Sequence, residues 1–298
     1  QKNVSVYGQE YTKTTYKLAR MNLAIRGISA DIRMGDTFHN DQHKDLKADY
    51  IMANPPFNQS GWRADNELTT DPRWAGFETP PTSNANYGWI LNILSKLSTD
   101  GVAGFILSNG ALSADGTELA IRRKLLEMGK VEAICILPQK MFYSTGISVT
   151  LWILNNNKKA RVSTKNGKEL HYRDREREIL FLDLRQIGSP YEKKFIELTD
   201  EDRAKIAATY HAWQMVDWKD NYKDIPEFCC AATFEEVKEK EFSLVPSKYI
   251  TFKNRDEGVN FDAKIAEIQK ELIGILAEEA KGRAELENLF AELGFKLK

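Results

Sequence analysis

Short apolar runs alternate with amphipathic segments through the first half of this chain, and this alternation limits the possible folds more than any other feature. Runs of strand length lie at residues 4–7, 30–34, 48–53, 102–107, 131–137, 147–154 and 179–184. Segments with apolar residues at helical spacing lie at 15–25, 87–97 and 118–128. Strands and helices in turn are typical of α/β proteins. The pattern therefore predicts a doubly wound α/β fold with a mainly parallel sheet.

The composition is that of an ordered globular protein. Hydrophobic residues make up 42% and charged residues 29% of the 298 residues, which argues against a disordered chain. The formal net charge of -1 is not that of a protein that binds duplex DNA alone. No apolar stretch approaches the roughly 20 residues that a bilayer-spanning helix needs. Three cysteines, Cys135, Cys229 and Cys230, fit a reduced protein, so we expect a cytoplasmic location and no membrane.

Polar residues follow two of the predicted strands. Gly35-Asp36 follows the run at 30–34, and Asn54-Pro55-Pro56-Phe57 follows the run at 48–53. In open α/β sheets, ligands bind beyond the carboxyl ends of the strands, so we expect a binding site there. The four histidines lack the spacing of a metal site, and we expect no bound metal.

The tetrapeptide at residues 54–57 is the most specific local feature. Its two prolines fix φ and donate no hydrogen bond, so the chain turns stiffly away from the sheet while the carbonyls of Asn54 and Pro55 remain acceptors. The Asn54 amide adds one more acceptor and Phe57 adds a flat face. This set can hold an amino group on a planar heterocycle. The alternative is a proline-stiffened turn with a packed phenylalanine.

Two further segments have alternative interpretations. Residues 59–86 show no regular pattern, and loops of that length are either functional lids or disordered. Residues 158–178 hold eight basic and four acidic side chains around Asn166-Gly167, a strong hairpin signal. That segment is predicted to be either a solvated β-hairpin or a flap that contacts phosphates.

The character of the chain changes after about residue 186, where helical patterns dominate, and we place a domain boundary between 185 and 186. The last helix carries apolar residues at alternating steps of four and three from Phe261 to Leu293, interrupted at Glu279 and Gly282. Such spacing is typical of a coiled-coil seam. The spacing alone leaves open whether this helix, at about 261–293, covers its own domain or binds a partner's helix.

The tetrapeptide resembles the Asn/Asp/Ser-Pro-Pro-Tyr/Phe/Trp motif of the amino-methylating, S-adenosylmethionine-dependent DNA methyltransferases. Further segments follow in the order and spacing of the modification (M) subunit of type I restriction-modification systems. They are Tyr7-Gly8-Gln9-Glu10, Gly35-Asp36, Gly104 to Leu112, Leu137-Pro138, Phe142 to Ile147 with Thr145-Gly146, and Ser243 to Ile250. The chain therefore resembles this N6-adenine DNA methyltransferase family, and the resemblance covers nearly its whole length.

The resemblance implies a Rossmann-like methyltransferase sheet and methyl transfer from S-adenosyl-L-methionine to N6 of a flipped adenine. It implies catalytic roles for Asn54, Pro55, Pro56 and Phe57, with stacking of the target base on Phe57 and Phe142. It also implies that Glu10, Asp36 and Asn54 bind the cofactor. Glu10 would accept hydrogen bonds from the ribose hydroxyls, and Asp36 would accept one from the adenine amino group.

The chain departs from the family at its start. The family's glycine-rich loop, which holds the methionine part of the cofactor, precedes the carboxylate that matches Glu10, and residues 1–9 do not form it. We therefore expect residues 1–185 to be a catalytic core incomplete at its N-terminus, without its first strand and that loop, and residues 186–298 to be a mostly helical C-terminal region.

The resemblance also implies partners. They are DNA, a specificity subunit that binds two modification subunits, and a restriction subunit. Three other functions stay open from the sequence. They are a stand-alone adenine DNA methyltransferase, a methyltransferase of protein or RNA amino groups with the same Asn-Pro-Pro-Phe motif, and an assembly scaffold without activity.

Overall fold

A computed structural model describes residues 4–143, 146–165, 167–192, 194–253 and 261–293. Thr145 and Asn166, which the sequence analysis singled out, lie outside these ranges. The chain divides into two compact units, residues 1–251 and 252–298, which are described separately.

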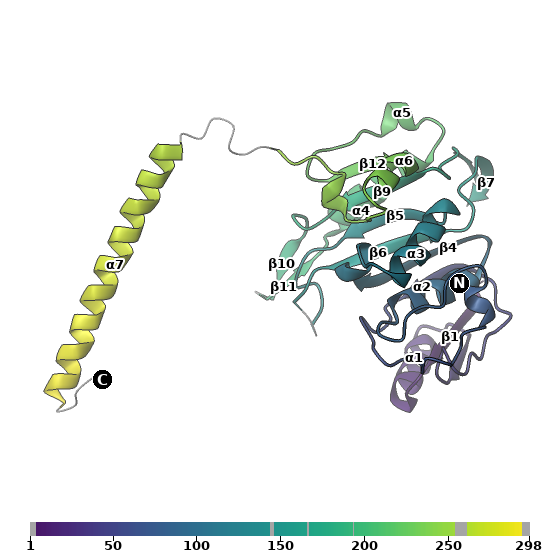
Figure 1. Cartoon of the computed structure of the whole chain (residues 1–298), viewed down its shortest axis with the longest axis horizontal. Helices are drawn as coiled ribbons and strands as arrows, with labels where there is room; N and C mark the ends of the chain where they lie inside the picture. Colours follow the sequence, from purple (N-terminus) through teal and green to yellow (C-terminus); the bar gives the residue numbers. More distant parts are fainter. Residues whose placement is uncertain (1–3, 144–145, 166, 193, 254–260, 294–298) are drawn as a thin grey trace. The chain divides into compact units, whose positions relative to one another are not determined.

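The larger unit contains a six-stranded sheet (Figure 1). Its spatial order is β12 (Cys229–Thr233), β9 (Glu178–Asp183), β5 (Val131–Ile136), β6 (Val149–Asn155), β4 (Leu97–Ser108) and β3 (Ala48–Ala53). The pairs β3–β4 and β5–β9 are parallel, and the pairs β4–β6, β5–β6 and β9–β12 are antiparallel. The prediction of a mainly parallel sheet is therefore wrong. The chain returns from β5 to β6 without a crossover helix, and this direct return makes β6 antiparallel to both of its neighbours.

Three two-stranded sheets complete the strand set of the described residues. A parallel pair joins β1 (Val6–Glu10) to β2 (Ala30–Met34), and antiparallel pairs join β7 (Arg161–Lys165) to β8 (Lys168–Tyr172) and β10 (Ser189–Tyr191) to β11 (Phe195–Glu197). In the part of the chain that the structure describes, β1 and β3 each pair with one strand only. One edge of each is therefore open.

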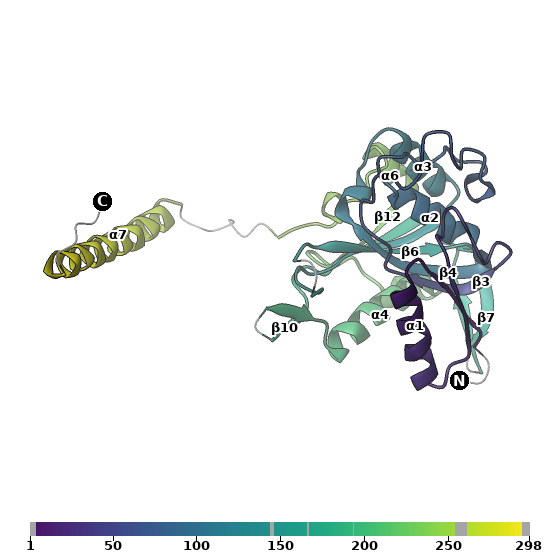
Figure 2. The same ribbon diagram turned by 90° about the horizontal axis from the view of Figure 1, so that it is seen from below.

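Helices cover both faces of the main sheet. The helices of the larger unit are α1 (Lys13–Ile25), α2 (Asn86–Ser95), α3 (Thr117–Glu127), α4 (Asp200–Gln214), α5 (Trp218–Asn221) and α6 (Phe234–Glu239), with short 3-10 turns η1 (Pro72–Trp74), η2 (Asn109–Leu112) and η3 (Pro246–Lys248). Figure 2 shows α2, α3 and α6 on one side of the sheet and α4 on the other. This arrangement confirms the doubly wound α/β prediction.

Two hydrophobic cores lie against these two faces. Alternate residues of one strand enter different cores, as the two-residue period of a strand requires. In β9, Ile179 and Phe181 join the core under α2, α3 and α6, whereas Leu180 and Leu182 join the core that contains Trp213 of α4. Every residue of β5 is buried, as expected for a strand covered on both faces.

The pairing of the strand at residues 229–233 shows that the larger unit extends beyond the predicted domain boundary. Because β12 pairs with β9 over five residues, residues after 186 belong to the same sheet as the predicted core. The compact unit ends at Thr251, rather than at the boundary of 185/186 placed from the sequence. Residues 186–251 also contain β10, β11 and β12, so they are less helical than predicted.

The smaller unit contains one long helix, α7 (Phe261–Glu292). This helix confirms the predicted element and carries the seam residues from Phe261 to Leu289, whereas Leu293 follows the end of the helix. The apolar seam side chains from Ile265 to Leu289 are exposed by 45–64%.

Candidate active site at the strand ends

The carboxyl ends of four strands meet at one edge of the main sheet. Strand β3 is parallel to β4, and β5 is parallel to β9. Strands β4 and β5 run in the same direction because each is antiparallel to β6. The loops after these strands carry Asn54 to Phe57, Asn109, the Pro138 to Phe142 segment and Arg185. The structure therefore brings the predicted catalytic tetrapeptide and Phe142 to the same edge.

The Asn54 loop leaves its acceptors open. Asn54 is exposed and Pro55 is buried, so the first proline fixes the loop to the sheet while the asparagine faces outward. Among the described residues, no hydrogen bond reaches the Asn54 side chain or the carbonyls of Asn54 and Pro55. These acceptors can therefore receive the two N–H groups of an amino substituent.

Asn58 anchors this loop, a role that the sequence analysis missed. Its Oδ1 accepts from Ser108 Oγ at 2.8 Å and from Asn86 Nδ2 at 2.9 Å. Its backbone N–H donates to Asn86 Oδ1 at 3.0 Å. Asn58 has a φ of 51°, a left-handed conformation that asparagine tolerates better than most residues. The Asn54 loop is thereby fixed to the start of α2 and the end of β4.

Phe57 and Phe142, the two predicted stacking residues, pack against the same hydrophobic core, the one that contains Trp213. Both are half-buried. Each ring therefore keeps part of its surface exposed at this edge of the sheet. The role in stacking remains a prediction, because half-burial against a core also fits packing alone.

Glu10 and Asp36 lie at the ends of the neighbouring strands β1 and β2. The carbonyl of Glu10 accepts the N–H of Gly35 at 3.0 Å. Asp36 Oδ1 accepts from the backbone N–H of Phe38 at 2.7 Å and of His39 at 3.1 Å. Asp36 is thus a turn cap, a role that short acidic side chains often have in turns. Among the described residues, its Oδ2 accepts no hydrogen bond, so the cap leaves one oxygen for a ligand.

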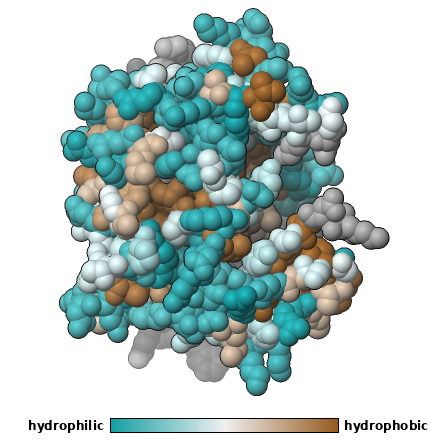
Figure 3. Space-filling view, turned by 90° about the vertical axis from the view of Figure 1, so that its right-hand side faces the viewer, coloured by the Kyte–Doolittle hydropathy of each residue, from teal (hydrophilic) through white to brown (hydrophobic). Residues whose placement is uncertain are grey.

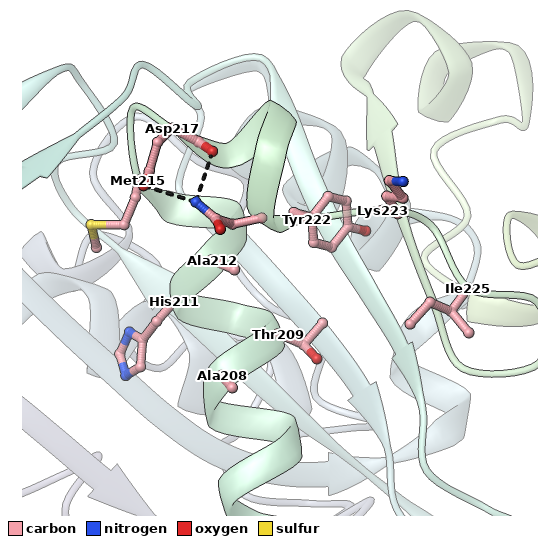
Figure 4. Close-up of a pocket in the computed structure, with 10 residues that line it drawn as sticks. Ala208, Thr209, His211, Ala212, Met215, Asp217, Tyr222, Lys223 and Ile225 are labelled. Atoms are coloured by element: carbon pink, nitrogen blue, oxygen red, sulfur yellow. Dashed lines mark hydrogen bonds between the residues drawn. The ribbon is translucent and has the colours of Figure 1, made fainter.

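One cavity of the larger unit borders this edge. It measures about 500 Å³ and is lined by residues that follow β5 and β9, among them Pro138, Lys140 and Arg185. Another cavity, also about 500 Å³, lies beside α4 and α5 (Figure 4). Its lining includes His211, Met215 and Asn221, and the Asn221 amide donates to Asp217 Oδ2 at 2.8 Å. That cavity contains none of the predicted site residues.

The described residues contain no group of three or more His, Cys, Asp or Glu side chains that could hold a metal ion. None of the described helices is long and apolar enough to cross a membrane.

Comparison with known proteins identifies the family. Residues 1–258 match the model of a family described as N-6 DNA Methylase. The chain belongs to this family. Over 298 residues it is 40% identical to the type I restriction enzyme HindI methylase subunit of Haemophilus influenzae, a match that covers 99% of this chain and 63% of that protein. It is 33% identical over 296 residues to the MjaIX methylase subunit of Methanocaldococcus jannaschii, covering 98% of this chain and 50% of that one.

The fold also matches that of a solved family relative. The methyltransferase subunit of the type I restriction-modification system from Streptococcus thermophilus superposes with a TM-score of 0.69 at 28% identity, covering 83% of this chain and 48% of that chain. The chain thus spans between half and two thirds of the length of the two curated relatives. The resemblance to type I modification subunits is thereby confirmed at the level of family and fold.

Proposed function

We propose that this chain is the methyltransferase part of a type I modification subunit, which methylates N6 of adenine in DNA. The observation that carries the proposal is the Asn54 loop at the carboxyl end of β3. It has open acceptors on Asn54 and Pro55 and two half-buried phenylalanines on one core beside the same sheet edge. The family match and the names of the relatives support the same reaction.

The loop suits the chemistry of a delocalised amine. The N6 lone pair of adenine is shared with the ring, so the nitrogen is a weak nucleophile. Acceptors at Asn54 and the Pro55 carbonyl would draw both N–H groups out of the ring plane and leave the lone pair on nitrogen. The same acceptors would stabilise the positive charge that grows on N6, and the proton that N6 loses after methyl transfer would pass to water. Phe57 and Phe142 would hold the flipped base between them.

The residues present fit the adenosine part of S-adenosylmethionine. Glu10 and Asp36 lie at the ends of adjacent parallel strands, and Asp36 Oδ2 is open among the described residues. Glu10 would accept from the ribose hydroxyls and Asp36 from the adenine amino group, while Asn54 would border the methyl group. When bound, S-adenosylmethionine supplies a methyl group activated by a positively charged sulfur.

We also propose that a further parallel strand pairs between β1 and β3 and carries the glycine-rich loop for the methionine part of the cofactor. The open edges of both strands support this proposal. So does the exposure of large apolar side chains near them, because Met52 of β3 is 91% exposed and Ile25 of α1 is 77% exposed. Figure 3 shows one face of the molecule on which apolar side chains gather in a patch bordered by hydrophilic ones.

The proposed partners are DNA, a specificity subunit and a restriction subunit. We propose that two modification subunits bind one specificity subunit, which reads the target sequence. The near-neutral charge of this chain supports such a division of labour, because target recognition by this chain alone would favour a basic surface.

The test is a methylation assay of the complete subunit with labelled S-adenosylmethionine. DNA, RNA and protein substrates are supplied with and without the specificity subunit. N6-methyladenine in DNA that depends on the specificity subunit supports the proposal. Efficient DNA methylation by the subunit alone would indicate a stand-alone enzyme, and label in RNA or protein would indicate another amino-group methyltransferase. If none of the substrates is labelled, the result would support the remaining alternative, an assembly scaffold without activity.

A further inference from the structure

The irregular segment between Phe57 and α2 contains a largely buried ion pair. The side chains of Arg73 and Asp71 are only 8% and 13% exposed, and Arg73 Nη2 lies 2.7 Å from Asp71 Oδ2. Arg73 Nε donates to Asp71 Oδ1 at 2.8 Å, so the contact is bidentate. The local sequence favours it, because Asp71 caps the N-terminus of η1 and also accepts the backbone N–H of Arg73 at 2.9 Å.

Arg73 extends from this pair to the turn that begins at Asp36. Its Nη1 donates to the carbonyl of Thr37 at 2.7 Å, and its Nη2 donates to the carbonyl of Phe38 at 2.5 Å. Asp36 Oδ1 holds the N–H of Phe38. Residue 38 is therefore fixed at its N–H by Asp36 and at its carbonyl by Arg73. Only a planar, multiply donating guanidinium can serve these carbonyls and the Asp71 carboxylate together.

Aromatic packing holds the same segment against α2. The Phe38 ring lies 4.4 Å from that of Trp62 and 4.4 Å from that of Trp89, measured between centroids. A side chain at Gly88 would meet Trp62 at 3.2 Å and Phe38 at 3.3 Å, so glycine is what lets these rings approach the helix. Trp62 and Trp74 are buried. The long segment is thus an ordered connection between the Asn54 loop and the Asp36 turn.

We propose that Arg73 is a positioning residue for cofactor binding, which acts by holding the Asp36 turn in the conformation that receives the cofactor's adenine. This inference rests on the proposed function. Without Arg73, the carbonyls of Thr37 and Phe38 lose their donor, and the turn must be ordered when the ligand binds. The Asn54 loop keeps its own anchors at Asn58, Asn86 and Ser108, so the transfer step itself is unaffected once the cofactor is bound.

Arg63 offers a matched control in the same segment. Its guanidinium donates only to carbonyls of the segment, namely those of Ala64, Asp65, Glu67 and Pro80. Arg63→Gln therefore removes a comparable set of hydrogen bonds from the segment without touching the Asp36 turn.

The experiment compares Arg73→Gln and Arg63→Gln in the complete subunit assembled with its specificity subunit. S-adenosylmethionine affinity is measured by calorimetry, and DNA methylation at saturating DNA gives kcat and the KM for S-adenosylmethionine. We expect Arg73→Gln to raise both the Kd and the KM by about tenfold with kcat within about twofold. We expect Arg63→Gln to leave all three unchanged. A lower kcat with an unchanged KM, or equal effects of both variants, would overturn the assignment.

Hydrogen exchange separates this inference from the proposed function. The amides of Phe38 and His39 should exchange faster in Arg73→Gln than in Arg63→Gln, whether or not the protein binds S-adenosylmethionine. If the unaltered complex neither binds S-adenosylmethionine nor methylates DNA, the proposed function fails. If it does both but exchange at these amides is the same in the two variants, only the role of Arg73 fails. Should Arg73→Gln not fold, Arg73→Lys and Asp71→Asn are measured in its place, with a smaller rise in KM expected and an unchanged KM overturning the assignment.

Discussion

Asparagine has two different functions within a few residues of the candidate site. Asn58 Oδ1 and the Asn86 amide are bound to each other and to Ser108, so these groups position the loop. The Asn54 amide has no such partner in the described part of the chain, so it can serve a ligand. The motif around Asn54 predicts its role from four consecutive residues. The role of Asn58 depends on Ser108, which lies 50 positions away, and local sequence cannot predict that contact.

The first prediction concerns Asn54. In the complete subunit, Asn54→Ala should abolish methylation because it removes one of the two acceptors for the N6 amino group. Its free energy of unfolding should change by less than about 1 kcal/mol, since the side chain is exposed. Single-turnover methylation and urea unfolding measure the two effects. The control is Gln59→Ala, a neighbouring exposed residue that should keep full activity. Substantial turnover by Asn54→Ala would reject the assigned role.

At the scale of elements, a buried network explains the basic segment at residues 158–178. Glu132 of β5 and Arg175 are fully buried and form an ion pair at 3.0 Å. Lys158 Nζ donates to the carbonyls of Val131 and Glu178, and Arg173 pairs with Glu178 at 2.7 Å. Much of the basic charge therefore joins the hairpin to the sheet. The segment also follows β6, whose end lies at the edge opposite the Asn54 loop, which favours the structural interpretation over the phosphate-contacting flap.

Bounds of elements were easier to predict than their directions. The strands at 30–34 and 48–53 have the predicted bounds, because each is a short apolar run ended by glycine or proline. The antiparallel direction of β6 was missed, since it depends on the path of residues 137–148 and not on any local pattern. The membership of β12 in the main sheet was missed for a similar reason, because pairing with β9 is a contact between segments far apart in the sequence.

The second prediction tests the network through Lys158. Burial lowers the pKa of Lys158 to about 8, despite the opposing charge of Glu132, whereas an unfolded lysine titrates near pH 10.4. Between these two pKa values the unfolded chain binds more protons than the folded chain. The free energy of unfolding should therefore rise with pH, by at most about 1.4 kcal/mol per pH unit. The stabilisation that results from deprotonation of Lys158 is complete above the pKa of the unfolded chain and is lost as the pH falls through the pKa of the folded chain.

The measurement is urea unfolding between pH 7.5 and 10, compared with Lys158→Met. The difference between the two proteins isolates Lys158 from the cysteine and tyrosine groups that titrate in the same range. The stability of the unaltered protein relative to the variant should increase across this interval. A constant difference would show that Lys158 titrates alike in the folded and unfolded chain.

At the scale of the whole molecule, the candidate site of the larger unit has two parts. The Asn54 loop belongs to the main sheet, whereas Glu10 and Asp36 belong to the separate β1–β2 pair. The two parts are connected through the segment that contains Arg73 and by contacts of residues 40–43 with β1, such as the hydrogen bond between His43 Nε2 and the carbonyl of Gly8 at 3.0 Å. A strand between β1 and β3 would join both parts in one continuous sheet.

The third prediction follows from these open edges. A complete subunit should bind S-adenosylmethionine far more tightly than residues 1–298 alone, because the added strand would fix the β1–β2 pair and hold the methionine part of the cofactor. Calorimetry on both proteins measures the difference. Adenosine serves as a control ligand, since Glu10 and Asp36 should hold it with a smaller difference between the two proteins. Equal affinity of both proteins for S-adenosylmethionine would show that no further strand is needed.

The last prediction concerns the apolar seam of α7. The steps of four and three place Ile265, Ile268, Leu272, Ile275, Leu286 and Leu289 along one stripe, and all are exposed by 45% or more. A narrow stripe suits pairing with another helix, and the proposed partner is the specificity subunit. Leu286→Glu together with Leu289→Glu should therefore weaken assembly, because two side chains that become buried on binding would carry unpaired charge.

A matched variant adds the same charge away from the seam. Ala284→Glu together with Asn288→Glu lies on the opposite stripe of the same helix by the heptad spacing, and it should assemble normally. Analytical ultracentrifugation of each variant with the specificity subunit gives the assembly constants, and circular dichroism of each variant alone checks its fold. The seam variant should keep its fold, since the larger unit has its own cores. An unchanged assembly constant, or a seam variant that is unfolded when alone, would assign the stripe to the internal packing of the subunit.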